Sequence, residues 1–117
     1  MLHTRALPGG LTLLVDELPH TRSVSVGFFI GVGSGHEPAE VAGISHLIEH
    51  LLFKGSAGYP TPKLISDTIE GVGGILDAYT DTETTVYYAK VADTHAERAI
   101  ALLGDMLCHP LLAPADL

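Results

Sequence analysis

The chain has 117 residues, enough for one domain or for part of a larger one, and 46% of them are hydrophobic against 17% charged. This composition is typical of a globular protein and excludes a disordered one. The formal net charge of −8 repels phosphate backbones and argues against nucleic acid as a partner, and no apolar run is long enough to span a membrane.

The N-terminus, MLHTRALPGG, lacks a basic segment followed by an apolar core, so no signal peptide is visible. This favours the cytoplasm, although a leader that had been removed would leave the same sequence. The first strand is expected over residues 10–18, which have β-type composition and end at Pro19. Residues 24–32 carry an apolar side chain at every second position, the pattern of a strand with one buried face. A loop rich in Gly, His, Glu and Pro follows over residues 33–43.

A first short helix is expected in GISHLIEHLLFKGS, residues 43–56. For a second helix, Thr61 is the expected N-cap and Pro62 the first helical residue. Residues 75–91 are rich in Thr, Tyr and Val around a polar DTET, which predicts a β-hairpin. A third helix is expected over residues 93–107, with Thr94 and Glu97 at capping-box spacing. The order β-β-α-α-β-β-α predicts an α+β fold with helices on one face of a largely antiparallel sheet.

The first helix carries His46, Glu49 and His50 on one side, together with Phe53, and its aliphatic residues on the other. His46 and His50 are four residues apart, so their rings lie one turn apart and can converge on one ion. Zinc binds neutral imidazole nitrogens, and a carboxylate beside it can take a proton from zinc-bound water. The alternative is an ordinary amphipathic helix whose solvent face happens to hold these residues. Phe53 on that face favours a half-buried cleft over open surface.

The segment GISHLIEHLLFKG resembles the signature of the pitrilysin or insulinase-type zinc metallopeptidases, which carry the inverted motif H-x-x-E-H. The likeness extends to VSVGFFIGVGSGHEP before it and to GGILDAYTDTETTVYYAKV and ALLGDMLCHPLL after it. It covers nearly all of the chain from Leu7 to Leu117, in the family's order. It implies the metalloenzyme fold shared with mitochondrial processing peptidase.

By this resemblance, His46 and His50 are ligands of one Zn²⁺ and Glu49 is the base that activates water for peptide hydrolysis. The family's third ligand is a glutamate on a later helix, expected just past Leu117, where residues 113–117 begin a helix. Residues 1–117 are therefore expected to be the N-terminal portion of a zinc endopeptidase domain, truncated, and inactive alone. The family also implies a second homologous half, in the same or another chain, that closes around the peptide substrate.

The resemblance further implies that Asp77, Ala78 and Tyr79 bind substrate, because the family aligns an extended peptide along the edge of this hairpin. Asp77 stands where the family usually has Asn, and an ionised Asp only accepts hydrogen bonds. A strand residue satisfied locally is the alternative for Asp77.

Two other functions remain open at this stage. One is a non-catalytic homologous subunit or scaffold, although such subunits usually lose motif residues that are present here. The other is an enzyme like S-ribosylhomocysteine lyase, which shares the inverted motif but takes a cysteine as third ligand, a role open to Cys108.

Overall fold

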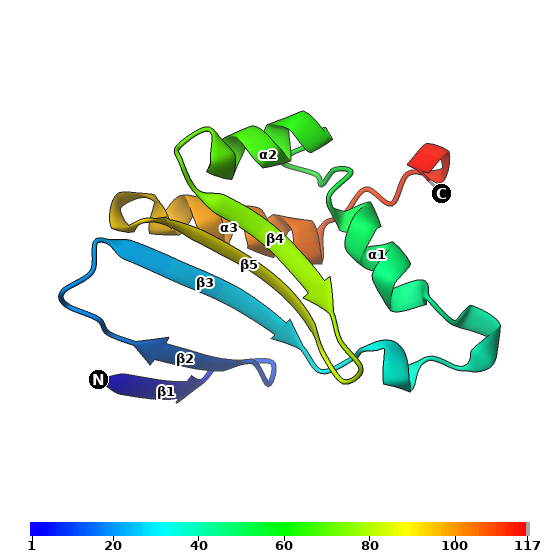
Figure 1. Ribbon diagram of the computed structural model, residues 1–117, viewed down its shortest axis with the longest axis horizontal. Coiled ribbons are helices and arrows are strands. Elements are labelled where there is room, and N and C mark those ends of the chain that lie inside the picture. The colour runs from blue at the N-terminus through cyan, green and yellow to red at the C-terminus, as the bar shows by residue number, and fades with distance from the viewer. Residues whose placement is uncertain (117) are drawn as a thin grey trace.

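The computed structural model describes residues 1–116, and its helices and antiparallel strands confirm the expected α+β class (Figure 1). The strands are β1 (Leu2–Ala6), β2 (Thr12–Asp16), β3 (Ser23–Ile30), β4 (Ile75–Thr80) and β5 (Thr85–Ala92). The helices are α1 (Ile44–Leu52), α2 (Pro62–Glu70) and α3 (Ala96–Cys108), with short 3-10 turns between some elements. No helix among the described residues has both the length and the hydropathy that a membrane crossing requires.

The main sheet has the order β3-β5-β4, with β5 in the centre and antiparallel to both neighbours. Alternate residues of β5, Tyr87, Ala89 and Val91, face the helices and are buried. They pack against Ala99, Leu102, Leu103 and Met106 of α3 and against Ile65 and Ile69 of α2. The helices therefore lie on one face of the sheet, as expected, and the core fills the space between the two layers (Figure 1).

The N-terminal strand β1 was not predicted. It pairs with β2 in a separate two-stranded sheet, from Leu2 opposite Asp16 to Ala6 opposite Thr12. Gly9 and Gly10 make the intervening turn possible because both have positive φ, at +87° and +90°. Its five residues, LHTRA, are short and largely polar, and they contain no run of apolar or β-branched residues that would predict a strand.

The predicted start of α2 is confirmed, and the predicted start of α3 is wrong. Thr61 caps α2 as expected, because its hydroxyl accepts the N–H of Leu64 at 3.1 Å and Pro62 follows it. The capping box at Thr94 is wrong, since a 3-10 turn occupies Asp93–His95 and α3 begins at Ala96 without a side-chain cap. At the C-terminus, Pro114–Asp116 forms a 3-10 turn, and the helix expected to continue through Leu117 lies outside the described residues.

The aliphatic side chains of helix α1 are buried only at its C-terminal end. Leu51 and Leu52 are each 5% exposed and reach the core, whereas Ile44, Leu47 and Ile48 remain 37–42% exposed. The aliphatic side predicted from the helical wheel is therefore covered over one turn only. Figure 1 shows the reason: α1 lies at the end of β4 and beyond the layer formed by α2 and α3.

Candidate metal centre

Helix α1 is anchored at its N-terminus by Glu37, which lies in the preceding loop. Its Oε1 accepts the N–H of Gly43 at 2.7 Å and its Oε2 accepts the N–H of Ser45 at 2.8 Å. These N–H groups belong to the first turn, where the helix offers no backbone acceptor. The two bonds hold the pKa of Glu37 below its ordinary value, that to Gly43 contributing most. One carboxylate therefore fixes the position of the helix that carries the motif.

His46 and His50 are both exposed on α1, and their rings are brought together as predicted. Their Nε2 atoms lie 3.1 Å apart, and the ring centroids lie 4.5 Å apart at an interplanar angle of 67°. Two imidazole nitrogens bound to one tetrahedral zinc at 2.0–2.1 Å would be separated by about 3.3 Å. The pair therefore fits two positions of a zinc site with little change of side-chain conformation.

Glu49 differs from the two histidines because it is half-buried and turned towards the sheet. The hydroxyl of Thr80, the last residue of β4, donates a hydrogen bond to its Oε2. Tyr87 of β5 lies close enough to sense the same carboxylate: burial raises the pKa of Tyr87 to about 12, and the negative charge of Glu49 adds to the increase. Glu49 is thus placed between the histidine pair and the end of the sheet.

The loop before α1 is also bound to the β4–β5 hairpin. The N–H of Ser34 donates to the carbonyl of Asp81 at 2.9 Å, and the N–H of Gly35 donates to that of Thr82 at 2.8 Å. The two chains are so close that a Cβ added to Gly33 would lie 2.1 Å from the Asp81 carbonyl oxygen. Residues 33–37 therefore hold the hairpin at one end and, through Glu37, hold α1 at the other.

The structure places Asp77, Ala78 and Tyr79 on β4, which has no second partner strand among residues 1–116. Asp77 and Tyr79 point to the sheet face opposite the helices, whereas Ala78 packs against the core. Tyr79 meets the ring of Tyr88 edge to face, at 6.4 Å and 61°. The carboxylate of Asp77 accepts the N–H of Ala78 at 2.8 Å, so it is satisfied locally.

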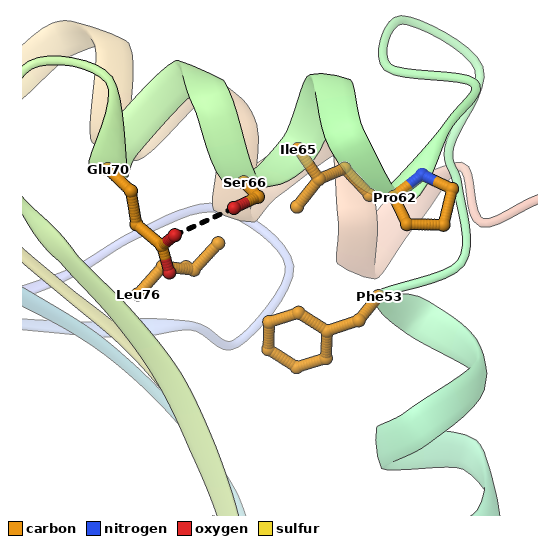
Figure 2. A pocket seen from close by; sticks show the side chains of 6 residues that line it. All are labelled: Phe53, Pro62, Ile65, Ser66, Glu70 and Leu76. Carbon is orange, nitrogen blue, oxygen red and sulfur yellow. Dashed lines mark hydrogen bonds between the residues drawn. The ribbon is translucent and has the colours of Figure 1, made fainter.

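A cavity of about 250 Å³ opens between the end of α1, helix α2 and strand β4. Figure 2 shows the ring of Phe53 directed into it from α1, with Ile65 and Pro62 on α2 and Leu76 on β4 around it. Ser66 and Glu70, joined by a hydrogen bond of 2.7 Å, form its polar end. The cavity lies beside β4, the strand that has no second partner among residues 1–116.

Glu37 and Thr80 were missed by the sequence analysis. Neither has a motif, and their roles depend on partners brought together only by folding, although Glu37 precedes the helix closely enough to have been considered as its cap. Within the described part of the chain, no group of three His, Cys, Asp or Glu side chains could hold a metal ion. Cys108, proposed as a third ligand for the lyase alternative, is exposed at the end of α3.

Comparison with known proteins confirms the resemblance. The family model described as Insulinase (Peptidase family M16) matches residues 12–117. A protein of Mycobacterium leprae named as an uncharacterised zinc protease is 46% identical over 110 residues, covering 94% of this chain and 24% of that relative. The mitochondrial-processing peptidase subunit beta of Saccharomyces cerevisiae is 39% identical over 109 residues, covering 93% of this chain and 23% of that protein.

The fold is likewise that of a solved peptidase. The crystal structure of pitrilysin superposes with a TM-score of 0.88 over 98% of this chain, at 27% identity, and the match covers 12% of pitrilysin. The chain spans about a quarter of the length of the curated relatives it matches, from 23% to 27%.

Proposed function

Because the chain belongs to the insulinase family of peptidases (peptidase family M16), we propose that it forms the metal-binding part of a zinc-dependent endopeptidase. The observation that carries the proposal is the convergence of the His46 and His50 Nε2 atoms at 3.1 Å, with Glu49 adjacent in the same helix. A hydrogen bond between the two imidazoles also brings their nitrogens to 3.1 Å, so metal content, and not this distance, decides between the two arrangements.

In the proposed mechanism, His46 and His50 would hold the metal through their imidazole nitrogens. A zinc ion bound there would polarise the peptide carbonyl and make a bound water acidic near neutral pH. Glu49 accepts the proton of the attacking water and delivers it to the amine that leaves when the peptide bond breaks. Within the described residues only Thr80 hydrogen-bonds to Glu49, through Oε2, so the second oxygen, Oε1, remains able to accept that proton.

We propose that the peptide binds along the edge of β4 by backbone pairing, which gives affinity without requiring a particular sequence. The N–H of Asp81 donates to the carbonyl of Thr84, so these two form a hydrogen-bonded pair. In an antiparallel ladder such pairs alternate, which directs the backbone groups of Leu76, Ala78 and Thr80 away from β5 and towards the open edge. The cavity beside Phe53 would then receive an apolar side chain of the peptide.

The same proposal assigns the third zinc ligand and a second homologous half to polypeptide beyond these residues, in the same or another chain. Residues 1–117 would then be the N-terminal portion of the peptidase domain. The relative named as a peptidase subunit supports a partnership of this kind. A cytoplasmic location remains part of the proposal and can be checked by cell fractionation.

The proposal is tested by Glu49→Gln in the protein at its full natural length. Gln preserves the shape and can still accept the Thr80 hydroxyl, but it cannot take a proton. We expect full zinc content and a loss of peptide hydrolysis of about 10²–10⁴-fold. Glu97→Gln, at an exposed position of α3, is the matched control and should keep its activity.

Full activity in Glu49→Gln would contradict the proposal, and loss of zinc would make Glu49 a ligand. A wild-type protein that binds zinc yet cleaves no peptide, alone or with its partner half, would favour the non-catalytic subunit.

A further inference from the structure

We infer that Thr80 is a positioning residue that holds the carboxylate of Glu49 in its working orientation; this rests on the proposed function. Its hydroxyl donates to Glu49 Oε2 across 31 residues of sequence, from the last position of β4 to the middle of α1. An oxygen that accepts a bond from a neutral hydroxyl stays in place without being neutralised. The remaining oxygen, Oε1, is then the one that would face the reacting water.

The position of Thr80 is determined by the sheet. Thr80 lies opposite Thr85 in the register of β4 and β5, and Thr85 is itself fixed by a bond of 2.8 Å from its hydroxyl to the carbonyl of Val32. Thr80 is half-buried on the helix-facing side of β4, in line with Leu76 and Ala78. Its β-branched side chain has few rotamers, so a fixed backbone also fixes the hydroxyl.

The position of Glu49 is determined separately, by the loop that precedes its helix. Glu37 binds the first turn of α1, while Ser34 and Gly35 of the same loop bind the carbonyls of the turn that follows Thr80. Both ends of the Thr80–Glu49 hydrogen bond are therefore attached to residues 33–37. Because residues 33–37 connect the two elements that carry Thr80 and Glu49, we expect this hydrogen bond to keep its geometry while a peptide binds and leaves.

Glu49 needs this support because of its length. A glutamate has three side-chain torsions, and a base that samples many rotamers spends little time within reach of the water. Residues that orient a reactive side chain through a hydrogen bond commonly change activity or metal affinity by about 10–100-fold when they are replaced. We expect Thr80 to act on the rate of the chemical step and to leave peptide binding unchanged.

The experiment compares Thr80→Val, Thr80→Ser, Thr68→Val and Glu49→Gln in the protein at its full natural length. Val keeps the shape of Thr without the donor, and Ser keeps the donor. Thr68→Val is the matched control, because it makes the same substitution and removes a hydroxyl that bonds to the carbonyl of Leu64 within α2. For each variant, kcat, KM, zinc content and the crystal structure around Glu49 are determined.

We expect Thr80→Val to lower kcat by about 10–100-fold, with KM within twofold, full zinc content and a Glu49 side chain that has left its wild-type rotamer. Thr80→Ser should restore kcat to within a few fold. An unchanged kcat in Thr80→Val, or an equal loss in Thr80→Ser or in Thr68→Val, overturns the inference. If Thr80→Val does not fold, a wild-type crystal structure with Glu49 turned away from Thr80 overturns it, and rescue by Ser supports it.

The two proposals fail in different ways. If Glu49→Gln is inactive and Thr80→Val is fully active, the peptidase function stands and the role of Thr80 is wrong. If Glu49→Gln is fully active, the proposed function itself fails, whatever Thr80→Val does.

Discussion

Asp105 of α3 accepts a hydrogen bond from the hydroxyl of Ser56, 49 residues earlier in the chain, at 2.6 Å. The same oxygen, Oδ2, also accepts the N–H of Gly58 at 2.8 Å. Ser56 is completely buried in the loop that joins α1 to α2, so the carboxylate ties this loop to the longest helix. The loop that follows α1 is thereby anchored to α3, just as Glu37 anchors the start of α1.

The first prediction concerns the acid stability that Asp105 provides. The bonds from Ser56 and then Gly58 lower the pKa of Asp105 below its ordinary value of 3.8. A carboxyl whose pKa is lower in the folded protein stabilises it fully above the ordinary value and loses that effect as the pH falls through the lower one. Asp105→Asn should therefore have a lower melting temperature than the wild type at pH 7. The difference between the two melting temperatures should become smaller as the pH falls.

Melting curves of the wild type and Asp105→Asn, recorded from pH 7 down to pH 2, check this prediction. Asp16→Asn is a suitable control, because Asp16 is exposed and its ion pair among residues 1–116 is with the exposed N-terminal amine. A difference in melting temperature that stays constant across the whole range would show that the charge of Asp105 is irrelevant.

The second prediction concerns Glu37 and zinc affinity. In Glu37→Gln, the side chain keeps one acceptor oxygen, but its NH₂ group is a donor and faces a backbone N–H. One of the two hydrogen bonds from Gly43 and Ser45 is therefore replaced by a repulsive contact. We expect faster hydrogen exchange at the start of α1 and zinc binding weakened by about 10-fold. Competition with a chelator measures the affinity. Glu40→Gln, in the same loop, should behave as the wild type.

The third prediction concerns the metal ligands. His46→Ala and His50→Ala, each made in the full-length protein, should lose stoichiometric zinc because a catalytic site normally has three protein ligands and cannot spare one. His20→Ala, at an exposed position between β2 and β3, should keep it. Metal analysis after dialysis decides the matter, and one zinc per chain in either motif variant would refute the assignment.

The fourth prediction concerns Asp77 and the open edge of β4. Its carboxylate occupies the N–H of Ala78, the donor that a peptide carbonyl would need. Asp77→Ala releases this donor, and one hydrogen bond is worth about 1 kcal/mol net, so peptide affinity should rise about fivefold. Asp77→Asn should not reproduce the gain, because the amide oxygen can still accept the N–H.

Peptide binding by Asp77→Ala is best measured in a Glu49→Gln background, in which the peptide is not cleaved. Asp81→Ala is the matched control, since Asp81 makes the same kind of bond to the next N–H, at 2.7 Å, but in the turn. An equal increase in peptide affinity in the two variants would mean that the loss of a negative charge improves binding, and not the release of the Ala78 N–H.

Sequence patterns predicted the parts of this molecule that depend on interactions between residues close together in the chain. The alternation in β3, the cap at Thr61 and the hairpin turn between β4 and β5 all act over a few residues, and the structure has each of them. Strand β1 was missed because its five residues are largely polar, whereas β2, equally exposed, contains Leu and Val residues that favour a strand. Thr94 failed as a cap because a 3-10 turn at that point satisfies the backbone differently.

The candidate site divides in the same way. The i, i+4 spacing of His46 and His50 is a property of one helix, so their convergence followed from the sequence. The partners of Glu49 and of the α1 N-terminus lie on other elements, and no pattern in the chain connects Thr80 or Glu37 to them. Which face of α1 is covered also depends on the position of the helix relative to the sheet, which amphipathicity alone does not determine.

The strand order β3-β5-β4 has a consequence for the pathway of folding. Strands β4 and β5 are joined by a short turn and can pair early, whereas β3 must wait until the whole segment containing α1 and α2 has been looped out, which costs more chain entropy. Thr80 belongs to the early hairpin, but Glu49 and the histidines arrive with that loop. We therefore expect the metal-binding geometry to be among the last features to form during refolding, after most secondary structure is present.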